Sequence, residues 1–367
     1  MNKAFEALDK IFRDKIELSP ELKSIFFAQF DYIYHYTNLD AFKNIVQTSN
    51  YTNGLWLSNA RFLNDAQEIE NGKKIALDFI DTIVNSSNLS LSKEEIQQTK
   101  DKIDAYNNDY YVCSFSKAKD SLEQWRSYSQ NGNGICIELC IKNNDNYFNL
   151  LQKDGKGLIL KKVIYEDRIK NEFVNSFKTL LKRNDNSIKK SFLEFGIGVA
   201  TVSALAFPFL FSTVGGAAIE AINELSSNLE TRELEINNTL KTIGLKEINE
   251  DNFIDNFVKV INIYYPFFKN ESFKSEEEIR LVYYDDHSNS TLKPIIKYRV
   301  PNSNMIVPYF NSQDLIPENK QVKLPISKVI IGPVANRKWI KESVRFFLDN
   351  NGYENVDIED SEVPYRG

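Results

Sequence analysis

The feature that most constrains this fold is a long helical block that separates two groups of strand-like segments. The first group, residues 32–36, 55–58, 110–115, 134–141 and 157–165, is rich in β-branched and aromatic residues. The second group comprises residues 278–284, 295–300, 305–310 and 327–331 and a short segment near 356. Residues 167–269, between the groups, show helical spacing of apolar residues. We therefore predict an α+β fold whose split, mixed or antiparallel β core is interrupted by a large helical insertion.

This order of elements divides the chain into four parts. Shorter helical patterns lie within residues 3–29, 40–46, 66–85, 92–106, 121–129 and 337–348. We predict an N-terminal helical segment (1–30), a first half of the α+β core (31–166), a helical insertion (167–267), and a second half of the core with a C-terminal helix (268–367).

Charge and cysteine content exclude some classes of protein. The chain of 367 residues carries 45 Lys and Arg against 51 Asp and Glu, so any basic patch for nucleic acid must be local. The three cysteines and two histidines do not have the spacing of metal ligands, and no metal is predicted. The low, odd number of cysteines and an N-terminal segment that alternates charged and apolar residues favour a reducing, cytoplasmic location.

One stretch within the helical insertion leaves two interpretations open. Residues 195–219 contain no charged residue, and a run of this length can span a bilayer. Lys189 and Lys190 precede it and acidic residues follow, which orients a spanning helix with its start in the cytoplasm. Pro208 near the centre and glycines near both ends instead divide the run into two short halves, typical of a buried helical hairpin. We predict either a covered hairpin or membrane association through 195–219.

A first candidate group of polar residues follows the first predicted strands. His35, Tyr36 and Thr37 end one strand, and Arg61 and Asn64 lie in the loop after the next. A histidine at a strand end can hold a ribose hydroxyl with one ring nitrogen while the backbone fixes the other. The alternative is a histidine that only satisfies the backbone in the core.

A second candidate group combines two serines with an aromatic helix. Ser114 and Ser116 end a predicted strand, and Trp125, Arg126 and Tyr128 follow on a short helix. An arginine between aromatic residues suits a phosphate paired with the guanidinium and a heterocycle stacked on the rings. The alternative is a Trp and a Tyr packed in the core beside a solvated Arg.

A third candidate group opens the strand at 278–284. In an extended strand Glu276, Glu278 and Arg280 point to one face. Two carboxylates and a guanidinium on one face either converge on a ligand or neutralise one another in a surface network.

Taken in order, these segments resemble a bacterial family, the domain-of-unknown-function family 2971. The resemblance covers residues 30–165 and 268–335 and leaves the helical insertion unmatched. It is carried by His35-Tyr36-Thr37, Leu55-Trp56-Leu57-Ser58-Asn59, Phe62-Leu63-Asn64-Asp65, Ser114-Phe115-Ser116, Trp125-Arg126-Ser127-Tyr128, Gly134-Ile135-Cys136-Ile137, the pair Glu278 and Arg280 after Glu276, Pro325 and Ile331-Gly332-Pro333.

That family is in turn similar, in the order of its polar strand ends, to ADP-ribosyltransferases, which bind NAD in a split β core. The resemblance implies that His35 holds a ribose hydroxyl and that Ser114 and Ser116 lie beside the nicotinamide amide. It implies that Glu278 is the catalytic carboxylate and that Glu276 positions the acceptor. Arg126 or Arg61 is then available to pair with the pyrophosphate.

The sequence departs from the transferase pattern at two of these motifs. Ser-Phe-Ser stands where one transferase class has Ser-Thr-Ser, and His35 stands where that class has Arg. We expect an NAD-dependent ADP-ribosyltransferase with an unidentified protein or nucleic-acid acceptor, acting as a toxin or a phage-defence effector, with NAD as substrate. The alternatives are a nucleotide-binding module without turnover, an NAD hydrolase, and an effector that acts on membranes through 195–219.

Overall fold

The computed structural model describes residues 19–26, 28–47, 54–62, 110–142, 146–152, 158–172, 264–284, 294–300, 305–316, 322–334 and 336–365, with isolated residues between 73 and 101 and residue 175. Asn64, residues 195–219 and most of the predicted insertion lie outside the described residues, as do most of the predicted helices at 66–85 and 92–106. Among the described residues, no helix combines the length and the apolar character needed to cross a membrane.

The strand-like segments of the sequence form strands, and most bounds agree within one or two residues. In the first half the elements are α2 (Pro20–Phe26), β1 (Tyr32–Thr37), α3 (Leu39–Val46), β2 (Trp56–Asn59), η1 (Ala60–Phe62), β3 (Tyr110–Ser116), α6 (Leu122–Tyr128), β4 (Ile135–Cys140), α7 (Asn146–Gln152) and β5 (Leu158–Lys162). In the second half they are η3 (Tyr265–Phe267), η4 (Glu271–Glu276), β6 (Glu278–Tyr284), β7 (Lys297–Arg299), β8 (Val307–Asn311), η5 (Ser312–Leu315), β9 (Ile326–Ile331), α12 (Arg337–Asp349) and β10 (Asp357–Asp360).

Strands from both halves of the chain join in one sheet of ten strands. Its main path runs β10-β9-β4-β1-β3-β2-β8-β7, and β6 pairs with both β3 and β5. Among the described strands, β10 and β9 pair in parallel and the other pairs are antiparallel. The longest contact between the halves is β3 with β6, from Tyr110 opposite Tyr284 to Ser116 opposite Glu278. A mixed α/β fold with a mostly antiparallel sheet is thus confirmed.

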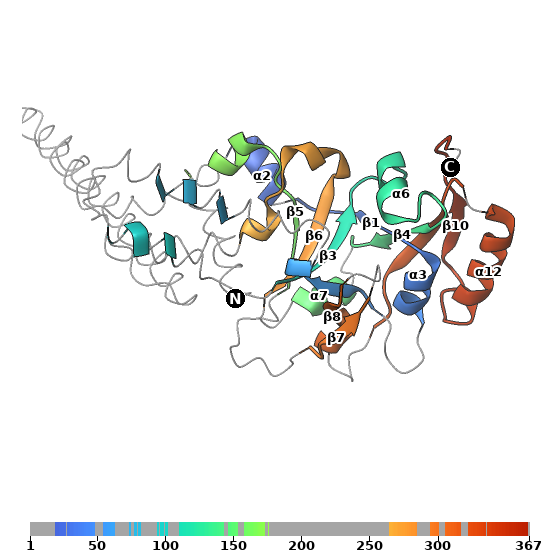
Figure 1. Ribbon diagram of the computed structural model, residues 1–367. Coiled ribbons are helices and arrows are strands. Elements are labelled where there is room, and N and C mark those ends of the chain that lie inside the picture. Colours follow the sequence, from blue (N-terminus) through green and yellow to red (C-terminus); the bar gives the residue numbers. More distant parts are fainter. Residues whose placement is uncertain are drawn as a thin grey trace, which may run out of the picture.

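Helices cover the two faces of the sheet unequally (Figure 1). On one face, buried residues of α3, α7 and α12 pack with alternate residues of the strands, including Leu57, Phe115 and Ile279, in the main hydrophobic core. On the other face, Trp125 of α6 packs edge-on against Tyr36 of β1, with ring centroids 4.9 Å apart. We call this second side the α6 face. Residues that alternate with the core positions of β3 and β6, such as Ser114 and Glu278, point toward it.

The sheet opens where β1 and β2 separate along β3. On the edge of β3 away from β6, β2 pairs with Tyr111 and Val112, and β1 pairs with Ser116 alone. Between these contacts no described strand pairs with Ser114 on this edge. We call this position the divergence point. The Ser114 side chain is exposed there, although Cys113 and Phe115 on either side are buried.

Candidate functional site

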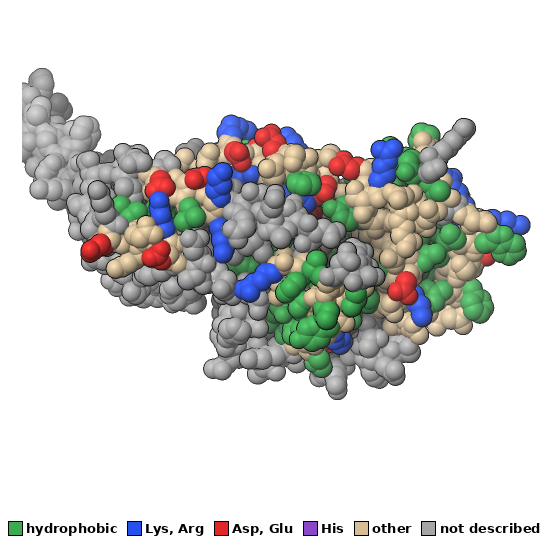
Figure 2. Space-filling model, viewed as in Figure 1, with side chains coloured by type: hydrophobic (Ala, Val, Ile, Leu, Met, Phe, Trp, Pro, Cys, Tyr) green, Lys and Arg blue, Asp and Glu red, His purple; other side chains and the backbone are tan. Residues whose placement is uncertain are grey.

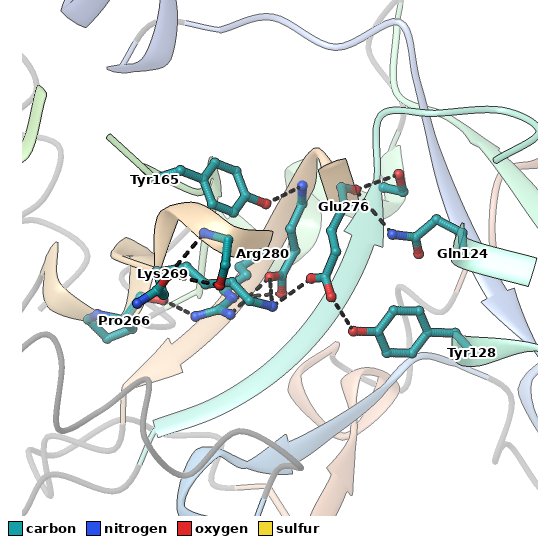
Figure 3. Close-up of polar contacts among 11 residues, drawn as sticks. Gln124, Tyr128, Tyr165, Pro266, Lys269, Glu276 and Arg280 are labelled. Atoms are coloured by element: carbon teal, nitrogen blue, oxygen red, sulfur yellow. Dashed lines mark hydrogen bonds and ion pairs between the residues drawn. The ribbon is translucent and has the colours of Figure 1, made fainter. Parts of the chain in front are cut away.

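A buried network of two cations and two carboxylates lies at the start of β6 (Figure 3). Lys269 Nζ lies 2.6 Å from Glu276 Oε2 and 3.0 Å from Glu278 Oε2. Arg280 donates from Nε to Glu278 Oε1 at 2.7 Å and from Nη2 to Glu278 Oε2 at 2.9 Å. Each of the four residues is at most 7% exposed. Their charges balance, as a buried ionic cluster requires.

The two carboxylates converge through a turn and not through an extended strand. Glu276 ends η4, and β6 begins only at Glu278. Between them Glu277 has φ 44° and ψ 45°, in the left-handed region, and its N–H bonds to the Lys274 carbonyl. The prediction that Glu276 and Glu278 lie together is confirmed, but the predicted strand geometry at Glu276 is wrong. The sharp turn at Glu277 brings the Glu276 carboxylate back over Lys269.

Helix α6 fixes the position of Glu276. The Tyr128 hydroxyl donates to Glu276 Oε1 at 2.9 Å. The Gln124 amide and the Ser116 hydroxyl donate to the Glu276 carbonyl at 3.2 Å and 2.9 Å. Burial, together with the nearby Glu276 charge, raises the pKa of Tyr128, so this phenol stays protonated and remains a donor.

The surroundings of Glu278 keep its carboxylate ionised. Burial alone favours the protonated acid, but the charges of Arg280 and Lys269 outweigh it and lower the pKa of Glu278 to about 2. The backbone N–H of Glu278 donates to the Tyr165 hydroxyl at 2.8 Å, which holds the start of β6. A carboxylate with so low a pKa is a poor general base at neutral pH, and its chemical use is electrostatic stabilisation of positive charge.

This pKa predicts a pH dependence of stability that replacement of Glu278 removes. The folded-state pKa lies below the ordinary value of 4.5, so ionised Glu278 stabilises the fold above that value and the gain is lost as the pH falls toward about 2. Between pH 4.5 and 3 we expect the free energy of unfolding of Glu278→Gln to change less steeply than that of the wild type, by up to about 1.4 kcal/mol per pH unit. Urea unfolding across this range measures it, and equal slopes contradict the assignment.

His35 satisfies the backbone at the divergence point. Its Nδ1 lies 3.0 Å from the Ser114 carbonyl oxygen, which has no described strand partner on that edge. Burial lowers the pKa of His35, and the charge of Arg299 acts in the same direction, so the ring is neutral near pH 7. Because a carbonyl only accepts, we assign the proton to Nδ1, which leaves Nε2 as an acceptor for a hydroxyl.

Several residues expected at a ligand site serve the fold instead. The Tyr36 hydroxyl donates to the Ala118 carbonyl at 2.8 Å, and Thr37 is buried. Trp125 is fully buried, and its Nε1 donates to Asp120 Oδ1 at 2.5 Å. Ser116 is also buried and binds the backbone of Glu276. The fold places these side chains in the interior, where the hydrogen bonds described here join them to other parts of the protein.

The aromatic platform expected around Arg126 is not formed. Arg126 is exposed and lies over the ring of Tyr365, with its guanidinium carbon 5.0 Å from the ring centroid. Tyr128 is 44% exposed and points its hydroxyl to Glu276. Arg61 is exposed on η1, after β2, and its backbone N–H donates to Asn59 Oδ1 at 3.1 Å. The two arginines expected at the pyrophosphate therefore lie on separate elements.

Three residues of this region escape sequence reasoning. Lys269 ends the helical block, seven residues before Glu276, and Tyr165 ends the strand-like segment 157–165, but neither belongs to one of the three candidate groups. Arg299 lies on a short edge strand and reaches back to Ser58 of β2. Turns and the pairing of distant strands bring them to the site.

Within the described part of the chain, no group of three or more His, Cys, Asp or Glu side chains is arranged to hold a metal ion. Comparison with models of known protein families, with curated protein sequences and with solved structures finds no significant match to this chain.

Proposed function

We propose that this protein is an NAD-dependent ADP-ribosyltransferase that acts on a macromolecular acceptor. The observation that carries the proposal is the meeting of His35, Ser114 and Glu278 around the end of β3. His35 contacts the Ser114 carbonyl, and Ser114 lies opposite Arg280 on β6. Arg280 in turn holds the ionised Glu278.

The chemistry of NAD cleavage suits these residues. When the bond between ribose C1′ and the nicotinamide nitrogen breaks, its electron pair leaves with nicotinamide and positive charge develops on the ribose. A permanently ionised Glu278 stabilises that charge, and neutral nicotinamide departs without a general acid. The acceptor then forms a bond to C1′ and releases its proton to solvent. Neutral His35 offers Nε2 to a ribose hydroxyl, and the exposed Ser114, whose side chain also hydrogen-bonds to Glu278, lies next to the catalytic carboxylate.

We assign to Glu276 the role of positioning the acceptor. Its carboxylate is held between Lys269 and the hydroxyl of Tyr128, an exposed residue of α6. A macromolecular acceptor that approaches along α6 therefore meets Tyr128 and then Glu276.

The test uses NAD labelled in its adenylate half, incubated with purified full-length protein, with and without cell lysate. Glu278→Gln is compared with Glu277→Gln, which alters the exposed neighbouring glutamate. We expect label to move onto protein or nucleic acid with the wild type and Glu277→Gln and to stay on NAD with Glu278→Gln. Free ADP-ribose as the sole product indicates a hydrolase. Equal transfer by Glu278→Gln contradicts the proposal.

One observation favours a second candidate, a nucleotide-binding module without turnover. Both Glu278 oxygens already accept hydrogen bonds from Arg280, and one also from Lys269, so the carboxylate is neutralised within the protein. Saturable NAD binding by calorimetry, with no nicotinamide released over the same period, supports this candidate over the transferase.

A further inference from the structure

Arg299 carries a positive charge that the described protein leaves unpaired. Its Nη2 donates to Ser58 Oγ at 2.9 Å, and its guanidinium carbon lies 5.7 Å from the centroid of the Trp56 ring. Its Nε is buried without a hydrogen-bond partner among the described residues. Burial lowers the pKa of Arg299, and no carboxylate opposes this effect.

The other cations of this region are paired. Lys297, two residues earlier on β7, lies 3.7 Å from Asp314. Arg280 binds Glu278 and the Pro266 carbonyl, and Lys269 binds Glu276 and Glu278. A cation that is partly removed from water without a counter-charge is unfavourable unless an anion completes it. Arg299 therefore differs from these cations in having no counter-ion among the described residues.

Arg299 faces the side of the sheet that carries the candidate site. It pairs with Val307 on β8, and β8 pairs with β2 so that Ser58 lies opposite Tyr309. Ser58 in turn lies opposite Val112, two residues from Ser114 and on the same face. The charge of Arg299 also acts on His35. The guanidinium thus lies beside the divergence point.

The other side of β7 has a different character. Figure 2 shows hydrophobic side chains gathered over β7 and β8, and Tyr298 and Ile306 are 68% and 63% exposed. Successive residues of a strand alternate between faces, so Arg299 points away from Tyr298. The guanidinium, over the Trp56 ring and bonded to Ser58, is held in place to accept an anion without reorganising.

We propose that Arg299 binds a phosphate group of a nucleoside diphosphate at the divergence point, beside His35. This inference rests on the proposed function and deepens it, because it assigns the pyrophosphate of NAD to Arg299 and not to Arg126 or Arg61. The planar guanidinium suits phosphate oxygens, and the hydrogen bond to Ser58 with the cation–π contact to Trp56 orients it.

The test measures binding of inorganic pyrophosphate and of ADP-ribose to full-length protein by calorimetry at low salt. Arg299→Gln is compared with Lys297→Gln, which removes a paired cation from the same face of the same strand. We expect Arg299→Gln to weaken both ligands roughly tenfold or more and Lys297→Gln to leave them near the wild-type value. No binding of either ligand by the wild type, or equal binding by Arg299→Gln, overturns the proposal.

Two further readouts separate this inference from the other claims. Glu278→Gln should retain pyrophosphate binding. If the wild type binds pyrophosphate through Arg299 but does not cleave NAD, the anion site is supported and only the transferase is contradicted. NAD cleavage that Arg299→Gln leaves unchanged contradicts only the anion site. If Arg299 has only a structural role, Arg299→Gln should have a lower melting temperature than the wild type. If Arg299 is an unpaired charge that awaits an anion, the melting temperature should be unchanged or higher.

Discussion

Replacement of Lys269 by Met is expected to lower the free energy of unfolding by about 3–5 kcal/mol, since it leaves a buried charge without its partner. Lys269 is 5% exposed and contacts both Glu276 and Glu278. In its absence Arg280 faces two carboxylates, and Glu276 keeps only the Tyr128 hydroxyl on its side chain among the contacts described above. Urea unfolding at pH 7 measures the change.

Lys274→Met is the matched control. Lys274 belongs to the adjacent η4, pairs with Glu166, and is 59% exposed. Its removal should change stability by about 1 kcal/mol or less. The double variant Lys269→Met with Glu276→Gln restores the charge balance and should lose less than the sum of its single variants. Equal losses for Lys269→Met and Lys274→Met contradict the buried network.

The second large effect concerns turnover. Glu278→Asp keeps the negative charge beside Arg280 and Lys269 but withdraws the carboxylate by one methylene group. A displacement of about 1 Å from the reacting centre is expected to lower kcat for NAD cleavage by about 100-fold, with a smaller change in KM. Release of nicotinamide under saturating NAD measures it.

Glu278→Asp also separates a loss of catalysis from a failure to fold. Glu278→Gln leaves two buried cations opposite a single carboxylate, so its inactivity alone could report instability. Circular dichroism and thermal melting confirm that each variant is folded at the assay temperature. A folded Glu278→Asp with wild-type kcat contradicts a catalytic role for this carboxylate and leaves it a structural member of the ionic network.

Much of the fold was accessible from the sequence. The runs at 110–115, 134–141 and 278–284 are β-branched, aromatic and bounded by turns, and they become β3, β4 and β6. The pattern does not predict α7, because Asn146–Gln152 has neither an acidic residue in its first turn nor a basic residue in its last. The pairing of β3 with β6 across the intervening block follows from the two groups of strands, but its register is a tertiary property.

The site was only partly predictable. The glutamates at 276 and 278 were found because they lie close in sequence, yet their convergence depends on the left-handed turn at Glu277, which no residue type there signals. For Trp125 the sequence left a stacking role and packing in the core both open; the structure shows packing in the core, where a large apolar ring gains most from burial. Lys269 and Arg299 reach the site through turns and strand register. The sequence around each residue does not indicate that it lies there.

The proposed transferase activity is tested most directly by release of nicotinamide from NAD by the wild-type full-length protein, followed with and without cell lysate. A transferase releases nicotinamide, and lysate increases the release as ADP-ribose passes to an acceptor. Absence of release under both conditions, with the protein folded and NAD bound, contradicts the transferase and leaves nucleotide binding as the function of the site.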